Sequence, residues 1–302
     1  MLKTGSLFLK LVKALGYSEN SKLLIIHADD AGLCHAENVA TIQAVETGMV
    51  SSYSMMVPCP WFTEMAQYAK RQPSIDYGIH LTLTCEWQDY KFGPVLPAHE
   101  VPSLVDEHGY FHPNRKLLAQ HAVNDEVQKE LKAQVERAFD FGLTPSHLDS
   151  HMYSVGARAE FLDIYRGLGR FYCLPTLINS QMMEEVGLDA SLHIRKDDLV
   201  VDRVFLGTFS DFEKGRLADF YEQVLRELPV GLNVILIHPA IDNHEMQGIA
   251  INHPNFGSEW RQIDYEYFSS QRCRTALLEN DIKLISWNDI KNLINSTERS
   301  PT

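Results

Sequence analysis

Short apolar runs alternate with segments of helical periodicity along this chain of 302 residues, and this alternation constrains the fold more than any other feature. Five of the runs have the length and the β-branched or aliphatic composition of buried strands. They cover residues 23–26, 50–57, 77–83, 234–237 and 282–285. Strands that alternate with helices pair in parallel. The pattern therefore predicts an α/β fold, as either an open doubly wound sheet or a barrel.

One helix and one insertion are clear from the pattern. Residues 125–141 carry apolar side chains three to four positions apart, so they predict a helix that ends near Gly142. Residues 86–124, after the third strand, are rich in Pro and Gly and too long for a simple connection, which is typical of a lid or binding loop. Because no repeat or linker follows, we expect an N-terminal amphipathic segment at 1–20 and a single domain at 21–302.

The N-terminus and the cysteines bear on the compartment. Residues 7–15 have the apolar content of a signal peptide, but Lys10 and Lys13 interrupt the run and no small-residue cleavage site follows. We favour a short amphipathic helix, with export as the alternative. The five cysteines never form a C-x-x-C pair, so neither a disulfide framework nor a cysteine zinc site is indicated. The cytoplasm, a reducing compartment, is the simplest interpretation.

Acidic residues outnumber basic ones. The chain has 40 Asp and Glu against 27 Lys and Arg, which gives a net charge of −13. Such a charge repels phosphate backbones and anionic lipid surfaces. No stretch approaches the roughly 20 apolar residues that span a bilayer. Nucleic acids and membranes are therefore not expected partners.

Side chains that bind metals or move protons stand at the ends of four predicted strands. They occur in His27-Ala28-Asp29-Asp30, Gly78-Ile79-His80, His147-Leu148-Asp149-Ser150-His151 and Ile237-His238. The carboxyl ends of parallel strands open on one face of the sheet or barrel. We therefore expect these groups to converge there, although they are far apart in the sequence.

The adjacent acids Asp29 and Asp30 need a further explanation. Neighbouring residues on a strand point to opposite faces, but at the strand end the backbone can turn both side chains toward one cavity. Two carboxylates in that cavity repel each other and lose hydration unless a cation is present. A divalent metal resolves the conflict, because one carboxylate can bind it while the other accepts a proton from a water that the metal holds.

A ligand set can be assembled from these positions. Asp30, His80 and His151 would form a two-histidine, one-carboxylate set with open positions for water and substrate. On a continuous strand, His147 would lie about 13 Å from His151, at roughly 3.3 Å per residue. Only a sharp turn of the chain would bring the two together. We therefore place His151 at the metal, with His147 and Asp149 in supporting positions behind the ligands.

Each of these residues has a simpler interpretation when taken alone. Asp30 could cap a turn or the following helix, and His80 could be a satisfied core histidine. His238 could bond a backbone group at its strand end. The convergence of all four strand ends favours chemistry. Trp87 is of a type usually found in a core or at a rim, yet its place shortly after the third strand would suit stacking on a sugar.

Five segments form an ordered set of motifs. They are LLIIHADDAGL (23–33), GMVSSYSMMV (48–57), GIHLTLT (78–84), PSHLDSH (145–151) and LIHP (236–239). Together they resemble the YdjC/ChbG-type carbohydrate deacetylases, with a match that runs from about residue 23 to residue 290. An ordered set of five is far more specific than any one motif.

The resemblance implies a deformed (β/α) barrel and a metal-dependent hydrolase. Such an enzyme removes the acetyl group from N-acetylated amino sugars, for example chitooligosaccharides. By position, Asp30, His80 and His151 match the metal ligands, Asp29 the general base, and His238, in its protonated form, a general acid. One divalent ion, Mg²⁺ or Zn²⁺, is implied, and a homodimer is an expectation from the family.

Departures from the family and rival functions remain open. The family usually has Asn where His27 stands and an aromatic residue where Ala31 stands, so the sugar or acyl group accepted is undetermined. A phosphoesterase would need cationic groups, and the motif segments contain no Lys or Arg beside the ligands. An iron oxygenase needs no second acid. A non-catalytic carbohydrate-binding protein would need neither Asp29 nor His238.

Overall fold

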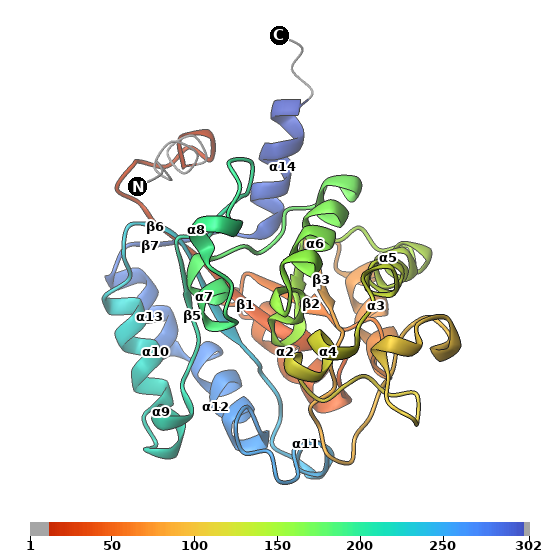
Figure 1. The fold of residues 1–302 in the computed structure, drawn as a ribbon. Helices are drawn as coiled ribbons and strands as arrows, with labels where there is room; N and C mark the ends of the chain where they lie inside the picture. Colours follow the sequence, from red (N-terminus) through yellow and green to blue (C-terminus); the bar gives the residue numbers. More distant parts are fainter. Residues whose placement is uncertain (1–11, 299–302) are drawn as a thin grey trace.

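The computed structural model describes residues 12–298, in which a parallel sheet is surrounded by helices (Figure 1). The strand order is β4-β3-β2-β1-β6-β5, and β7 pairs with the first residues of β1. All pairings between these strands are parallel. The strands are β1 (Lys22–Ala31), β2 (Ser52–Met55), β3 (Tyr77–Leu81), β4 (Leu148–Ser150), β5 (Arg203–Phe205), β6 (Gly231–Ile237) and β7 (Ile282–Leu284).

Isolated bridges continue the sheet between its two ends, β4 and β5. Leu148 of β4 pairs in parallel with Thr176, and Ile178 pairs in parallel with Val200, which lies just before β5. The two bridges complete a circuit around the sheet. The fold is therefore the expected deformed barrel rather than an open doubly wound sheet, and part of its wall consists of single bridges in place of a full strand.

Helices cover the outside of this barrel, with α10 and α13 on one side and α5 and α6 on the other in Figure 1. The helix predicted at 125–141 is α5, and it packs against β3 and α6. The helices are α2 (His35–Glu46), α3 (Phe62–Arg71), α4 (Arg115–His121), α5 (Asn124–Asp140), α6 (Ala159–Tyr172), α7 (Ser180–Glu185), α8 (Ala190–His193), α9 (Phe209–Glu213), α10 (Leu217–Arg226), α11 (His244–Ile249), α12 (Ser258–Phe268), α13 (Gln271–Glu279) and α14 (Trp287–Glu298), with the 3-10 helices η1 (Ala98–Glu100), η2 (Pro102–Leu104) and η3 (His151–Gly156).

The five apolar runs predicted as strands correspond to β1, β2, β3, β6 and β7, and the predicted extended segment at His147 contains β4. The sequence pattern does not predict β5, because Asp202 and Arg203 interrupt the apolar stretch in which it lies. The predicted insertion lies between β3 and β4, where the chain forms η1, η2, α4 and α5. Strands were therefore predicted correctly where the sequence contains a distinct apolar run.

The N-terminal segment predicted at residues 1–20 lies largely outside the described part of the chain, which begins at Val12. Val12 itself is buried in a cluster that includes Leu23 and Trp287, so the chain just before β1 packs on the barrel. The domain boundary at residue 21 stays a prediction. Across residues 12–298, none of the helices combines the length and the apolar character that crossing a membrane requires.

The residues of β1 alternate between two apolar clusters. Leu24 and Ile26 belong to the large cluster that includes buried residues of the surrounding helices. Leu23 and Ile25 belong to a second cluster, whose other members come from β5, β6, the start of α14 and the connecting residues Val12, Leu177, Val201 and Ile285. Because both faces of the strand are buried, β1 reads as a continuous apolar run in the sequence. The second cluster fills the amino-terminal end of the barrel interior.

Candidate active site

The interior face of β1 changes from apolar to polar along the strand. His27 and Asp29 follow Leu23 and Ile25 at intervals of two residues, so their side chains continue the same face. Both are buried, with 1% and 6% of their surface exposed. The polar end of the barrel interior therefore begins at His27, next to the second apolar cluster, which contains Leu23 and Ile25.

A β-bulge brings Asp30 to the same side as Asp29. The pairing of β1 with β2 shifts register between Ala28 and Ala31, and Asp30 has a left-handed φ of 64°. Such a conformation costs about 1–3 kcal/mol for a non-glycine residue and is commonest for Asn and Asp. This local conformation explains how the side chains of two consecutive carboxylates can point into the same site, as the sequence predicts.

Asp30, His80 and His151 lie together, and each offers a donor atom within 4.8 Å of the others. Asp30 Oδ1 is 2.9 Å from His151 Nδ1 and 3.2 Å from His80 Nε2. All three side chains are buried. They come from the ends of β1, β3 and β4, which are the positions that the sequence predicts for a metal-ligand set.

In each of these three side chains, the second nitrogen or oxygen atom has a hydrogen-bond partner of its own. His80 Nδ1 is 3.0 Å from Asp149 Oδ1, and His151 Nε2 is 2.9 Å from Glu86 Oε2. Arg261 Nη2 donates to Asp30 Oδ2 at 2.8 Å. Metal-binding histidines usually have such a carboxylate behind them, which fixes the ring and its tautomer. The residues present therefore fit a divalent cation.

The buried carboxylates of this group are stabilised by positive charge. Burial raises the pKa of Asp30, but the charges of His151 and Arg261 outweigh it and hold this pKa well below its usual range. Burial lowers the pKa of His151, whereas the charges of Glu86 and Asp30 raise it to about 9. Without a cation, a proton on the imidazole compensates the carboxylates. A metal ion would replace that proton.

Asp29 stands beside the ligand group and faces His238. Its Oδ2 is 3.6 Å from His238 Nε2, and its Oδ1 is 3.3 Å from His27 Nε2. Burial lowers the pKa of His238 to about 4, so its ring is neutral at neutral pH. To act as the expected general acid, His238 must therefore take up a proton first. The His238 backbone N–H donates to Asp264 Oδ2 at 2.9 Å, which fixes the residue just past β6.

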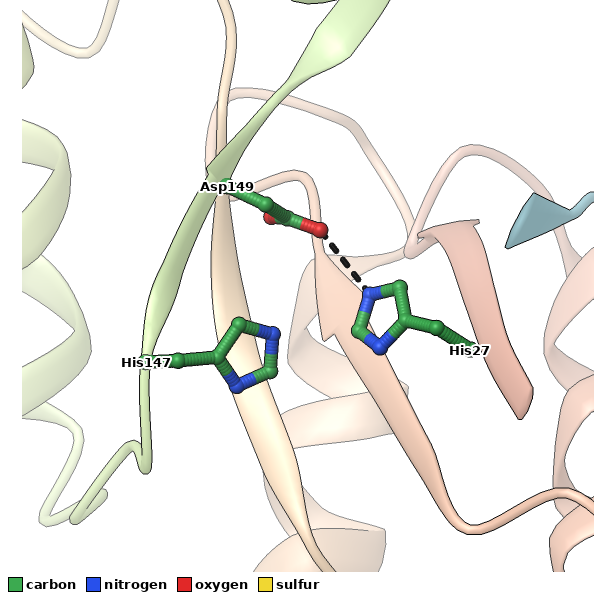
Figure 2. A group of neighbouring side chains, drawn as sticks. All are labelled: His27, His147 and Asp149. Carbon is green, nitrogen blue, oxygen red and sulfur yellow. Dashed lines mark hydrogen bonds and ion pairs between the residues drawn. The ribbon is translucent and has the colours of Figure 1, made fainter. Parts of the chain in front are cut away.

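His147 lies away from the Asp30 group, one layer deeper in the barrel. Its ring stacks on Trp287 with 5.0 Å between ring centroids, while Asp149 is hydrogen-bonded to His27 at 2.9 Å (Figure 2). The strand ends at Ser150, and the two residues after His151 have left-handed φ angles of 51° and 47°. Because this turn comes only after His151, it does not bring His147 and His151 together, and His151 alone of the two contacts Asp30.

Trp87 does not contact solvent, which corrects its predicted role in sugar stacking. The side chain is 0% exposed. The Arg261 guanidinium lies 5.4 Å from the centre of its ring, and the ring of His253 lies 5.1 Å away. With its ring covered by protein, Trp87 supports Arg261 and has no free face for a ligand.

Two charged residues of the site were missed by the sequence analysis. Arg261, on α12, pairs with Asp30 and Glu37, and Glu86, in the insertion, pairs with His151. The motif segments contain no Lys or Arg, but Arg261 of α12 contacts Asp30 directly, so the site does contain a cationic group. Its Nε, Nη1 and Nη2 donate to Phe256 O, Glu37 and Asp30, respectively. With 1% exposure, it presents no free face to a substrate phosphate.

We expect Arg261→Met to lower the free energy of unfolding of the metal-free protein by about 3–5 kcal/mol, because it leaves the buried Glu37 carboxylate without its counter-charge and removes one of the positive charges beside Asp30. Urea denaturation with a chelator present measures this. Arg170→Met is the control, because Arg170 makes only an exposed ion pair, worth about 0–1 kcal/mol. Equal stability of the two variants would contradict the expectation.

The comparison with protein families agrees with this geometry. The family model described as "YdjC-like protein" matches residues 23–279, which contain all of the site residues named above except Trp287. The chain belongs to the YdjC-like family. The match begins at β1 and ends with α13, so it covers the barrel almost completely.

Relatives of this YdjC-like chain have similar lengths. A protein named carbohydrate deacetylase from Thermoanaerobacter pseudethanolicus is 26% identical over 270 residues, which cover 89% of this chain and 100% of the relative. One of the same name from Thermus thermophilus is 31% identical over 263 residues, covering 85% and 90%. A solved structure from Enterococcus faecalis V583, described as a cellobiose-phosphate cleavage protein, superposes with a TM-score of 0.74 at 27% identity, covering 89% of this chain and 99% of that one.

Proposed function

We propose that this chain is a carbohydrate N-deacetylase that depends on one divalent cation at Asp30, His80 and His151. The observation that carries the proposal is the convergence of these three ligands with a separate carboxylate, Asp29, beside them. The names of the two deacetylase relatives support the reaction class. The substrate class that we propose is an N-acetylated amino sugar or a short oligosaccharide of such sugars.

The donor set also bears on the cation. Two imidazoles and one carboxylate suit Zn²⁺ and similar transition metals, whereas Mg²⁺ prefers oxygen donors. We therefore propose Zn²⁺ ahead of Mg²⁺. When bound, the cation would polarise the acetyl carbonyl and lower the pKa of the attacking water.

The protein's own residues then handle the protons. Asp29 accepts a proton from the water that attacks the acetyl carbon. Because His238 is neutral before the reaction, it must first take the proton from Asp29, and the two side chains, 3.6 Å apart between Oδ2 and Nε2, must close to hydrogen-bond distance for this transfer. His27 Nε2 lies 3.3 Å from the other oxygen of Asp29, while Oδ2 faces His238. One carboxylate and one imidazole thus move a single proton from water to amine.

Incubation with N,N'-diacetylchitobiose and with N-acetylglucosamine tests the proposal. We expect acetate and free amine to appear in equal amounts, activity to disappear after chelation, and Zn²⁺ to restore it. Release of phosphate from phosphorylated sugars without any acetate would support a phosphoesterase instead. Binding of the sugars with no product would support a non-catalytic carbohydrate-binding protein.

A further inference from the structure

A second group of metal-binding side chains lies one layer below the proposed active site. His27, His147 and Asp149 each offer one donor atom, and these atoms lie within 4.8 Å of one another. All three side chains are at least 98% buried. In Figure 2 the His147 ring is directed toward the His27 and Asp149 side chains, which are joined by a hydrogen bond. None of the three belongs to the Asp30 ligand set.

The hydrogen bonds of His147 leave one of its nitrogen atoms without a partner. The Ser146 hydroxyl donates to Tyr77 O at 2.9 Å and lies 2.8 Å from His147 Nδ1. A hydroxyl has one proton, so toward Nδ1 it accepts, and Nδ1 carries the ring proton. Nε2 then has a free lone pair, and it is buried with no hydrogen-bond partner. Such an unmatched group costs about 1–3 kcal/mol, unless a ligand binds it.

The His147 ring is also held rigidly in this orientation. A side chain at Gly78 would place its Cβ only 2.5 Å from His147 Nε2, so glycine makes room for the ring on that side. Trp287 stacks against the ring at an interplanar angle of 20°. The edge of the His147 ring meets His27, with 4.9 Å between ring centroids. Fixed orientation and a bound proton on the other nitrogen are the features of a metal-ligating histidine.

The spacing of the neighbouring donors suits a small cation. Ser54 Oγ is 2.8 Å from Asp149 Oδ2 and 3.1 Å from His27 Nε2, and the latter two atoms are 2.9 Å apart. Ligands around tetrahedral Zn²⁺ at about 2.0–2.2 Å stand roughly 3.4 Å from one another. The Ser54, His27 and Asp149 donors therefore need to separate by only a few tenths of an ångström, and the His147 donor lies within 4.8 Å of those of His27 and Asp149.

We propose that His27, His147 and Asp149 bind a second divalent cation of the zinc type, with the Ser54 hydroxyl as the nearest fourth donor. This site does not depend on the proposed deacetylase function. The other oxygen of Asp149 is bonded to His80 Nδ1 at 3.0 Å. A cation on Asp149 would therefore fix the carboxylate that orients His80, a ligand of the first site. The second ion would strengthen the barrel interior and the first site together.

Metal analysis of protein loaded with Zn²⁺ during refolding tests the proposal. We expect two ions per chain in the wild type. His27→Asn removes one donor but can still hydrogen-bond Asp149, and His147→Phe keeps the stacking on Trp287 but removes the donor. Each variant should bind one ion. His151→Ala, the matched control in the first site, should also bind one ion, while His27→Asn combined with His151→Ala should bind none.

Titration of the metal-free wild type with Co²⁺ gives an answer without any variant. We expect two binding steps in the visible absorption spectrum, each with the intensity of a four-coordinate site. A single ion that is lost in His151→Ala and retained in His27→Asn or His147→Phe would show that the deeper group is a hydrogen-bonded cluster only. That result would overturn this proposal and leave the proposed function intact. A single ion lost only in the two deeper variants would support this site and overturn the first.

Discussion

We expect Asp29→Asn to lower kcat by about 10²- to 10⁴-fold, the usual contribution of a general base, while the bound cation and KM stay unchanged. The amide keeps the size of the side chain and its place beside His27 and His238, so the packing of the site is preserved. It cannot accept the proton of the attacking water. The loss therefore falls on the chemical step and not on binding. Initial rates with N,N'-diacetylchitobiose, together with metal analysis, measure both quantities.

Asp202→Asn is the matched control for this variant. Asp202 Oδ2 accepts a hydrogen bond from Leu232 N at the start of β6. This is the amino-terminal end of the strands, and the site lies at their carboxyl ends. The substitution makes the same change of charge and keeps an oxygen to accept that bond. It should leave kcat unchanged. Asp29→Asn with more than half of the wild-type activity would remove Asp29 from the role of base.

We expect His80→Ala and His151→Ala to abolish both the cation at Asp30 and the activity. Loss of a partner behind a ligand typically lowers metal affinity by about 10- to 100-fold, and loss of the ligand itself should exceed this. His80 and His151 supply two of the three metal-binding atoms in the group that they form with Asp30, so neither can be replaced by its neighbours. Calorimetric titration of the metal-free variants with Zn²⁺ measures the change, and acetate release measures the activity.

His35→Ala is the control for these two variants. His35 follows the loop after β1 and pairs with Glu64 on the surface, with no contact to the Asp30 group. Its loss should change neither Zn²⁺ affinity nor activity by more than about two-fold, because an exposed pair of this kind contributes little. Wild-type Zn²⁺ affinity in His80→Ala and His151→Ala would reject the proposed ligand set, whatever the effect on activity.

Several features of the site could not be predicted from local patterns. Glu86 reaches His151 over 65 positions of sequence, and Arg261 reaches Asp30 over 231. Arg261 sits in an amphipathic helix with no motif to distinguish it from other basic residues. Trp87 was misjudged because residue type and position near His80 say nothing about what covers its ring. These partners are chosen by the packing of elements that are remote in the sequence.

Periodicity and motif order were enough to predict the parallel α/β fold, the family, and the positions of Asp29, Asp30, His80, His151 and His238 at the ends of strands. They were enough because hydrophobic periodicity is local, and parallel strands must open their carboxyl ends on one face. The bulge at Asp30, the lowered pKa of His238 and the buried group around His147 became apparent only in the three-dimensional arrangement. Each of these depends on register, burial or a distant neighbour, which no local spacing encodes.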